Sequence, residues 1–158
     1  MILDIKIRNL YSINEEVTID FQAGEIKSEI LDELEDNYVS VGEDKILKSL
    51  GIFGPNASGK SNIIKAISFG NYVILQSHTF NPGYVFEHEP FKLDEASING
   101  PSYFSISFLL DEIKYAYSFL FNKEGILKES LYYYPNKEQK LIYSRVESNN
   151  PDREKNYL

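Results

Sequence analysis

The sequence predicts a mixed α/β fold in which a strand–loop–helix unit is combined with an antiparallel meander of strands. Three observations lead to this prediction. Apolar and polar residues alternate near the N-terminus, a glycine-containing loop separates an apolar run from a helical pattern, and four alternating runs follow residue 101. A period of two is typical of strands and a period of about 3.6 is typical of helices, so both kinds of element are expected.

The first 24 residues are predicted to form a β-hairpin. Apolar side chains occupy every second position over 2–8 and again over 16–22, and residues 9–15 connect the two runs. The alternating residues are Ile5, Ile7, Val17, Ile19 and Phe21. Two strands that are adjacent in the sequence usually pair with each other, which favours a hairpin over residues 1–24.

Acidic residues are concentrated in the first third of the chain. Residues 1–50 hold 12 acids and 5 bases, and residues 51–158 hold 12 acids and 11 bases, which together give the net charge of −8. Residues 25–36 form either a short surface helix or a solvated charged loop. A surface that binds nucleic acid needs clustered Lys and Arg, so this chain is not expected to bind DNA by itself.

Residues 46–80 are predicted to form the strand–loop–helix unit. The apolar run 46–53 indicates a buried strand, and Ile63, Ile64 and Ile67 begin a helical pattern that continues through residues 73 and 74. Between them, residues 54–61 match Gly-x-x-x-x-Gly-Lys-Ser, the phosphate-binding loop or Walker A motif.

Each residue type in this loop has a physical role in binding a nucleotide. Glycine lets successive backbone N–H groups point at a phosphate, and the following helix directs its positive end at the same anion. Lys60 is expected to reach the β- and γ-phosphates, and Ser61 to offer its hydroxyl to Mg²⁺. The predicted phosphate-binding residues are Gly54, Pro55, Asn56, Ala57, Ser58, Gly59, Lys60 and Ser61. The predicted cofactors are therefore ATP and Mg²⁺, since no Asn-Lys-x-Asp motif for guanine is present.

Residues 102–146 are predicted to form an antiparallel meander of four strands. Asp111 and Glu112 follow an apolar run, as the catalytic carboxylates of a Walker B strand would. The run alternates through Ser105 and Ser107, however, and alternation resumes directly after Glu112, which favours a hairpin turn over a catalytic pair. His78 and His88 lack a third ligand that would indicate a metal site.

The stretch 47–66 resembles the ABC-type ATPases of the RecF, chromosome-maintenance and OLD (overcoming-lysogenisation-defect) group. More narrowly, it is similar to AAA ATPases of bacterial abortive-infection and defence operons. The stretches 8–12, 90–94 and 105–134 share this resemblance. The resemblance implies that residues 1–158 are the incomplete N-terminal part of such an ATPase domain, with the fold of an ABC-ATPase-like lobe.

The resemblance also implies partners. Family members close the ATP site with a Ser-Gly-Gly signature loop from a second subunit and carry a Walker B strand and a switch His, none of which this sequence shows. The expected partners are thus the remainder of the ATPase and a second subunit, with DNA or a defence effector engaged through the larger assembly. Gln76 is a candidate for the family's Mg²⁺-contacting Gln. Tyr11 stands where these proteins commonly have a basic residue.

The prediction is a cytoplasmic protein, because the chain has no Cys and shows neither a signal peptide nor an apolar span for a membrane. It is expected to bind Mg·ATP within a bacterial defence or DNA-maintenance ATPase and to hydrolyse little in isolation. Two alternatives stay open. One is a complete small P-loop kinase that uses Asp111 and Glu112, and the other is a non-catalytic module whose assembly nucleotide controls.

Overall fold

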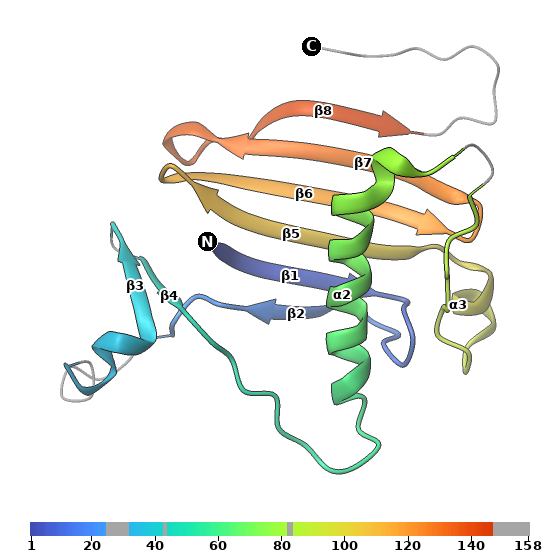
Figure 1. Ribbon diagram of the computed structural model, residues 1–158, viewed down its shortest axis with the longest axis horizontal. Helices are drawn as coiled ribbons and strands as arrows, with labels where there is room; N and C mark the ends of the chain where they lie inside the picture. The colour runs from blue at the N-terminus through green and yellow to red at the C-terminus, as the bar shows by residue number, and fades with distance from the viewer. Residues whose placement is uncertain (25–31, 43, 82–83, 147–158) are drawn as a thin grey trace.

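The computed structural model describes residues 1–24, 32–42, 44–81 and 84–146. Its main feature is a six-stranded sheet in the order β2-β1-β5-β6-β7-β8, in which neighbouring strands run antiparallel (Figure 1). The strands are β1 Ile2–Arg8, β2 Val17–Asp20, β5 Ser102–Leu110, β6 Ile113–Asn122, β7 Gly125–Tyr134 and β8 Lys140–Val146. The predicted mixture of helix and mostly antiparallel sheet is confirmed.

Strand β1 lies inside the sheet because it pairs on both sides. Ile5 faces Ile19 of β2 on one side and Ile106 of β5 on the other. The strands β5 to β8 then follow one another in sequence order. At the β5–β6 turn, Asp111 and Glu112 have φ values of 49° and 63°, as the two central residues of a tight hairpin turn require. The prediction of a turn at these two residues is confirmed.

Helix α2, Lys60–Gln76, packs across one face of the sheet at a steep angle to the strands (Figure 1). Its buried residues are Ala66, Gly70 and Val73. They meet the buried sheet residues Ile5, Ile7, Phe104, Phe119 and Phe121. The helix comes closest at Gly70, where an added Cβ would lie 2.2 Å from a ring carbon of Phe104. The absence of a side chain at Gly70 therefore sets the distance between helix and sheet.

The segment before α2 differs from the prediction. Strand β4, Asp44–Leu47, pairs with β3, Tyr38–Val41, in a separate two-stranded sheet, and residues 48–59 form neither helix nor strand. The expected buried strand over 46–53 is therefore wrong beyond Leu47. Phe53 is 93% exposed. A central strand needs neighbours for its backbone groups, and no strand of the described residues lies beside residues 50–53.

Further short helices lie between the strands along the chain. Residues Asp32–Asn37 form two turns of 3-10 helix, and Ser77–Thr79 and Pro135–Lys137 form one turn each. Most of the predicted surface helix over 25–36 lies outside the described residues. Helix α3, Glu95–Asn99, precedes β5, and its first turn is capped by Asp94, whose carboxylate accepts a hydrogen bond from the Ser97 N–H at 2.8 Å.

The outer part of the sheet is held by a polar cluster around Glu129 on β7. Its carboxylate accepts hydrogen bonds from the hydroxyls of Tyr117 at 2.7 Å and Tyr143 at 2.6 Å, and it pairs with Arg145 at 2.8 Å. Burial, followed by the hydrogen bonds and charge of Glu129, raises the pKa of both tyrosines. This cluster joins β8 to β7 and β6.

No helix in the described part of the chain has the length and apolarity to cross a lipid bilayer.

Candidate functional site

The candidate site is the loop of residues 54–59 together with the first turn of α2. Ala57 has a φ of 62° and Gly59 a φ of 91°, so two of the last three loop residues are in the left-handed region. Gly59 is the N-cap residue of α2, and its carbonyl accepts the N–H groups of Asn62 at 2.9 Å and Ile63 at 3.2 Å. Alternation of left- and right-handed residues turns neighbouring N–H groups toward one side, a geometry that favours anions.

The side chain of Lys60 folds back over this loop. Its ammonium donates hydrogen bonds to the carbonyl oxygens of Gly54 at 2.8 Å and Pro55 at 2.6 Å, and lies 3.5 Å from the Ser58 hydroxyl. The described residues give Lys60 no carboxylate partner. Its positive charge is therefore held inside the loop by neutral oxygens alone, where a negative ligand would be strongly attracted.

The beginning of α2 is poorly stabilised by the protein itself. Gly59 offers no side-chain cap, and the first turn has no Asp or Glu but begins with Lys60. Gly in place of a capping side chain costs a helix only a few tenths of a kcal/mol, and a cation at this end opposes the helix dipole. Backbone N–H groups of the first turn, including those of Lys60 and Ser61, have no acceptor within the helix. An anion bound here would satisfy these groups.

A tight turn after β1 lies against the same place. Residues Leu10 and Ile13 exchange backbone hydrogen bonds of 3.0 Å, which puts Tyr11 and Ser12 at the tip. The Ser12 hydroxyl accepts a hydrogen bond of 2.8 Å from the side-chain amide of Asn62. We refer to residues 9–14 as the β1 turn.

A pocket of about 260 Å³ opens between the β1 turn, α2 and residues 89–93. The Lys65 ammonium lies 4.3 Å from the centre of the Tyr11 ring and 3.6 Å from the Glu89 carboxylate. Lys92 lies 3.8 Å from the other oxygen of Glu89. Both lysines thus pair with the same carboxylate, and the charge of Glu87 also acts on Tyr11. The residues that line the pocket are Tyr11, Ser12, Asn62, Lys65, Glu89, Pro90, Phe91, Lys92 and Leu93.

Tyr11 contributes an aromatic face and not a charge. Burial, followed by the negative charges of Glu89 and Glu87, raises the pKa of its hydroxyl above the ordinary value. The hydroxyl is therefore protonated at neutral pH. Lys65 places a cation over this ring, so positive charge is present at the β1 turn although residue 11 is not basic.

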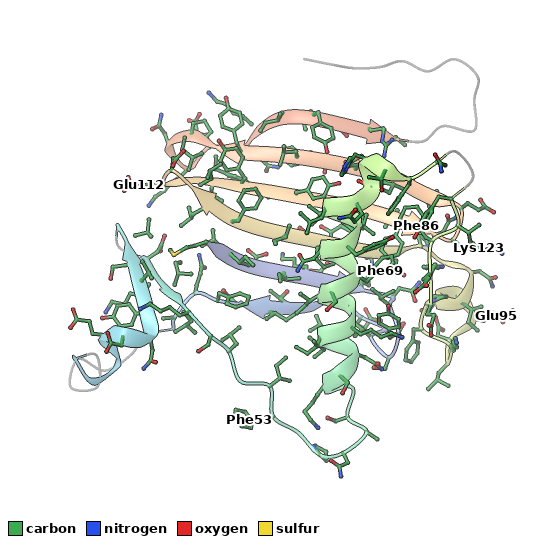
Figure 2. The ribbon with its side chains drawn as sticks, in the orientation of Figure 1. Phe53, Phe69, Phe86, Glu95, Glu112 and Lys123 are labelled. Carbon is green, nitrogen blue, oxygen red and sulfur yellow. The ribbon has the colours of Figure 1, made fainter. Side chains whose placement is uncertain are left out.

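Three of the predicted site residues lie away from the loop. Gln76 is the last residue of α2, about 22 Å along the helix from Ser61 at a rise of about 1.5 Å per residue, so the two cannot bind one Mg²⁺. Asp111 and Glu112 form the β5–β6 turn, and Figure 2 shows Glu112 at the end of the sheet away from the start of α2. The described structure therefore does not bring these two carboxylates to the loop.

His78 and His88 do not form a metal site in the described residues. His78 lies in the 3-10 turn after α2. His88 Nε2 lies 2.9 Å from the Ser102 hydroxyl, which itself donates to the carbonyl oxygen of Asn9. Burial, together with the nearby charge of Lys123, lowers the pKa of His88. These contacts give His88 a structural role, because they join its segment to the start of β5 and the end of β1.

The loop before α2 has the sequence pattern with which nucleotide-binding proteins hold phosphate. The chain belongs to the family described as "AAA domain, putative AbiEii toxin, Type IV TA system", whose model matches residues 49–156. The predicted resemblance to AAA ATPases of abortive-infection systems is confirmed by this match. No curated protein matches the chain.

Sequence reasoning alone missed several residues around the loop. Ser12, Asn62, Lys65 and Glu89 come together only in the folded chain, because Ser12 and Glu89 lie far from residues 62–65 in the sequence. One signal for them was available. Two of the stretches that carry the family resemblance, residues 8–12 and 90–94, flank the pocket.

Proposed function

We propose that the chain binds Mg·ATP, with the phosphates held by residues 54–61. The observation that carries this proposal is the beginning of α2, which has no side-chain cap, no acidic residue in its first turn and a left-handed glycine at its N-cap. These properties are unfavourable for an isolated helix, but they suit a helix whose N-terminus binds an anion. The family, whose members are nucleotide-binding ATPases, supports the same ligand.

Phosphate binding would use groups that the loop already presents. The Lys60 ammonium would exchange its bonds with the carbonyls of Gly54 and Pro55 for bonds with phosphate oxygens. The N–H groups at the start of α2 would donate to the same phosphates. Ser61 is exposed in the first turn and offers a hydroxyl oxygen, a ligand type that suits Mg²⁺. Bound Mg²⁺ would neutralise part of the phosphate charge.

The pocket beside the loop would take the nucleoside. It is bounded by Ser12 and Asn62, which lie next to the last loop glycine, so a nucleotide that begins in the loop reaches it directly. Its volume of about 260 Å³ lies just below the usual range of small-molecule sites, about 300–1,000 Å³. The aromatic rings of Tyr11 and Phe91 in the lining offer surfaces for a base.

Hydrolysis by this chain alone would be slow. Asp111 and Glu112, for which the sequence favours a turn over a catalytic role, lie in the β5–β6 turn, so the base for phosphoryl transfer would come from elsewhere. We propose that the remainder of an ABC/OLD-like ATPase and a second subunit supply it. A role in bacterial defence, and DNA or an effector bound through the larger assembly, belong to the same proposal. So does a cytoplasmic location.

Titration calorimetry with ATP and Mg²⁺ tests the loop assignment. Lys60→Ala should weaken ATP binding about 10- to 100-fold, because it removes a charge-assisted hydrogen bond to phosphate. Lys128→Ala, which removes an exposed lysine from β7, is the matched control and should leave the affinity unchanged. Equal ATP affinity in the wild type and Lys60→Ala would exclude the loop as the binding site.

A second candidate function is assembly controlled by nucleotide without turnover. It is favoured by apolar side chains that stay exposed near the loop, Phe53 at 93% and Ile64 at 56%. Figure 2 shows Phe53 away from the sheet, on the segment that leads into α2. Light scattering with and without ATP distinguishes the two functions. A rise in mass with ATP and no release of phosphate would support assembly control, and an unchanged mass would exclude it.

A further inference from the structure

In the described residues, one hydrogen bond joins the phosphate-binding loop and the first turn of α2 to another element of the protein. The hydrogen bonds of residues 54–61 in the described structure stay within the loop and the first turn of α2. Within residues 54–63, only the side chain of Asn62 bonds to another element, through its 2.8 Å hydrogen bond to the Ser12 hydroxyl. On the N-terminal side, Phe53 is almost fully exposed and gives the loop no anchor.

The contact between Ser12 and the loop is close as well as polar. A Cβ added to Gly59 would lie 2.9 Å from the Ser12 oxygen, nearer than real Cβ atoms approach. Glycine at position 59 thus serves two purposes. It allows the left-handed φ of 91°, and it leaves room for the Ser12 hydroxyl.

The β1 turn is a firm support for this contact. Leu10 is fully buried and Ile13 nearly so, and both belong to the hydrophobic core. The side-chain amide of Asn9 donates to the carbonyl oxygens of Ser97 at 2.8 Å and Gly100 at 3.1 Å. The tip of the turn is therefore held in place by the packing of Leu10 and Ile13 and by the hydrogen bonds of Asn9.

We propose that Ser12 is a positioning residue for the phosphate-binding loop. Through Asn62 it fixes the first turn of α2, and by packing on Gly59 it fixes the last residue of the loop. The N–H groups at the helix start then face the phosphates without having to be ordered when the ligand binds, which lowers the cost of binding. This inference rests on the proposed function, because it concerns affinity for the phosphate chain.

The test is calorimetric titration of four variants with two ligands, ATP and inorganic triphosphate, each with Mg²⁺. Loss of one hydrogen bond corresponds to about a 3- to 10-fold change, so Ser12→Ala and Asn62→Ala should each weaken both ligands by that factor. The double variant should bind as weakly as either single variant, because both remove the same bond. Ser12→Thr keeps the hydroxyl and should bind as the wild type does.

Controls separate positioning from general stability. Ser68→Ala removes an exposed hydroxyl from the same helix and should change neither affinity nor melting temperature. The melting temperatures of ligand-free Ser12→Ala and Asn62→Ala should stay close to that of the wild type, because the Ser12–Asn62 hydrogen bond is exposed. Recovery of affinity in Ser12→Thr is an effect that a merely destabilised protein would not show.

Several outcomes would overturn the proposal. Wild-type affinity in Ser12→Ala would do so, and so would additive losses in the double variant. A loss confined to ATP, with inorganic triphosphate bound normally, would mean that Ser12 contacts the nucleoside instead. The proposed function has its own readout, since it fails if Lys60→Ala binds ATP normally. Lost binding in Lys60→Ala with full binding in Ser12→Ala refutes only the positioning role.

Discussion

Gly70 offers the sharpest test of how α2 packs on the sheet. In an exposed helix, Gly→Ala stabilises by about 1 kcal/mol, because alanine favours the helical backbone. At Gly70 the new Cβ would lie 2.2 to 2.5 Å from three ring carbons of Phe104, a side chain with no exposed surface. Overpacking of a rigid core costs about 1–3 kcal/mol and sometimes more, and this contact is at the severe end.

We therefore expect Gly70→Ala to lower the free energy of unfolding by about 2 kcal/mol after the gain in helix propensity. The melting temperature should fall by about 4–8 °C for a chain of this size. Urea unfolding followed by far-UV circular dichroism or tyrosine fluorescence measures this directly, since the chain has 12 Tyr and no Trp. Asn71→Ala, at the exposed neighbouring position, is the control for propensity and should be slightly stabilising.

A double-mutant cycle shows whether the ring of Phe104 is the cause. Phe104→Leu alone should destabilise through lost burial, and combined with Gly70→Ala it should cost at least about 1 kcal/mol less than the sum of the two. If Gly70→Ala is as stable as the wild type, or if the two losses add, the close packing of α2 on β5 is refuted.

Two further changes test the region under residues 86–101. Because the pKa of His88 is lowered in the folded protein, the unfolded chain binds a proton more readily, and the free energy of unfolding should fall as the pH drops below about 6.5. In thermal unfolding between pH 5 and 8, His88→Gln should lose this dependence on pH. The control variant His78→Gln should keep it. Asn9→Ala should destabilise by about 1–3 kcal/mol in urea unfolding, because it removes the part-buried hydrogen bonds to the carbonyls of Ser97 and Gly100. Asn9→Gly tolerates the φ of 52° equally well, so a neutral Asn9→Gly would show that the hydrogen bonds contribute little.

The sequence was informative wherever local rules decide the structure. The β5–β6 turn at Asp111 and Glu112 followed from alternation on both sides, because alternating runs that meet within two residues can only form a tight hairpin. Helix α2 followed from apolar spacing after the glycine loop. In both cases the information lies within about a dozen residues of the element.

Elsewhere the outcome depended on residues far along the chain. Ile52 and Phe53 are as apolar as a core strand, but burial requires a neighbouring strand, and the described residues place none there. The β3–β4 hairpin was not predicted, although Gly42 between two short runs is a turn signal. The contact of Ser12 with Asn62 joins residues 50 positions apart, so no local pattern could have shown it.

The interior position of β1 has a consequence for the order in which parts of the molecule open. Its backbone groups are bonded on both sides, to β2 and to β5, so its amides are expected to exchange with solvent water only in the rarest openings. The turn that carries Ser12 continues directly from this strand. The loop of residues 54–59, which follows an exposed segment, thus contacts a turn that continues from the strand expected to exchange most slowly. Local opening that frees residues 48–58 would leave that support intact.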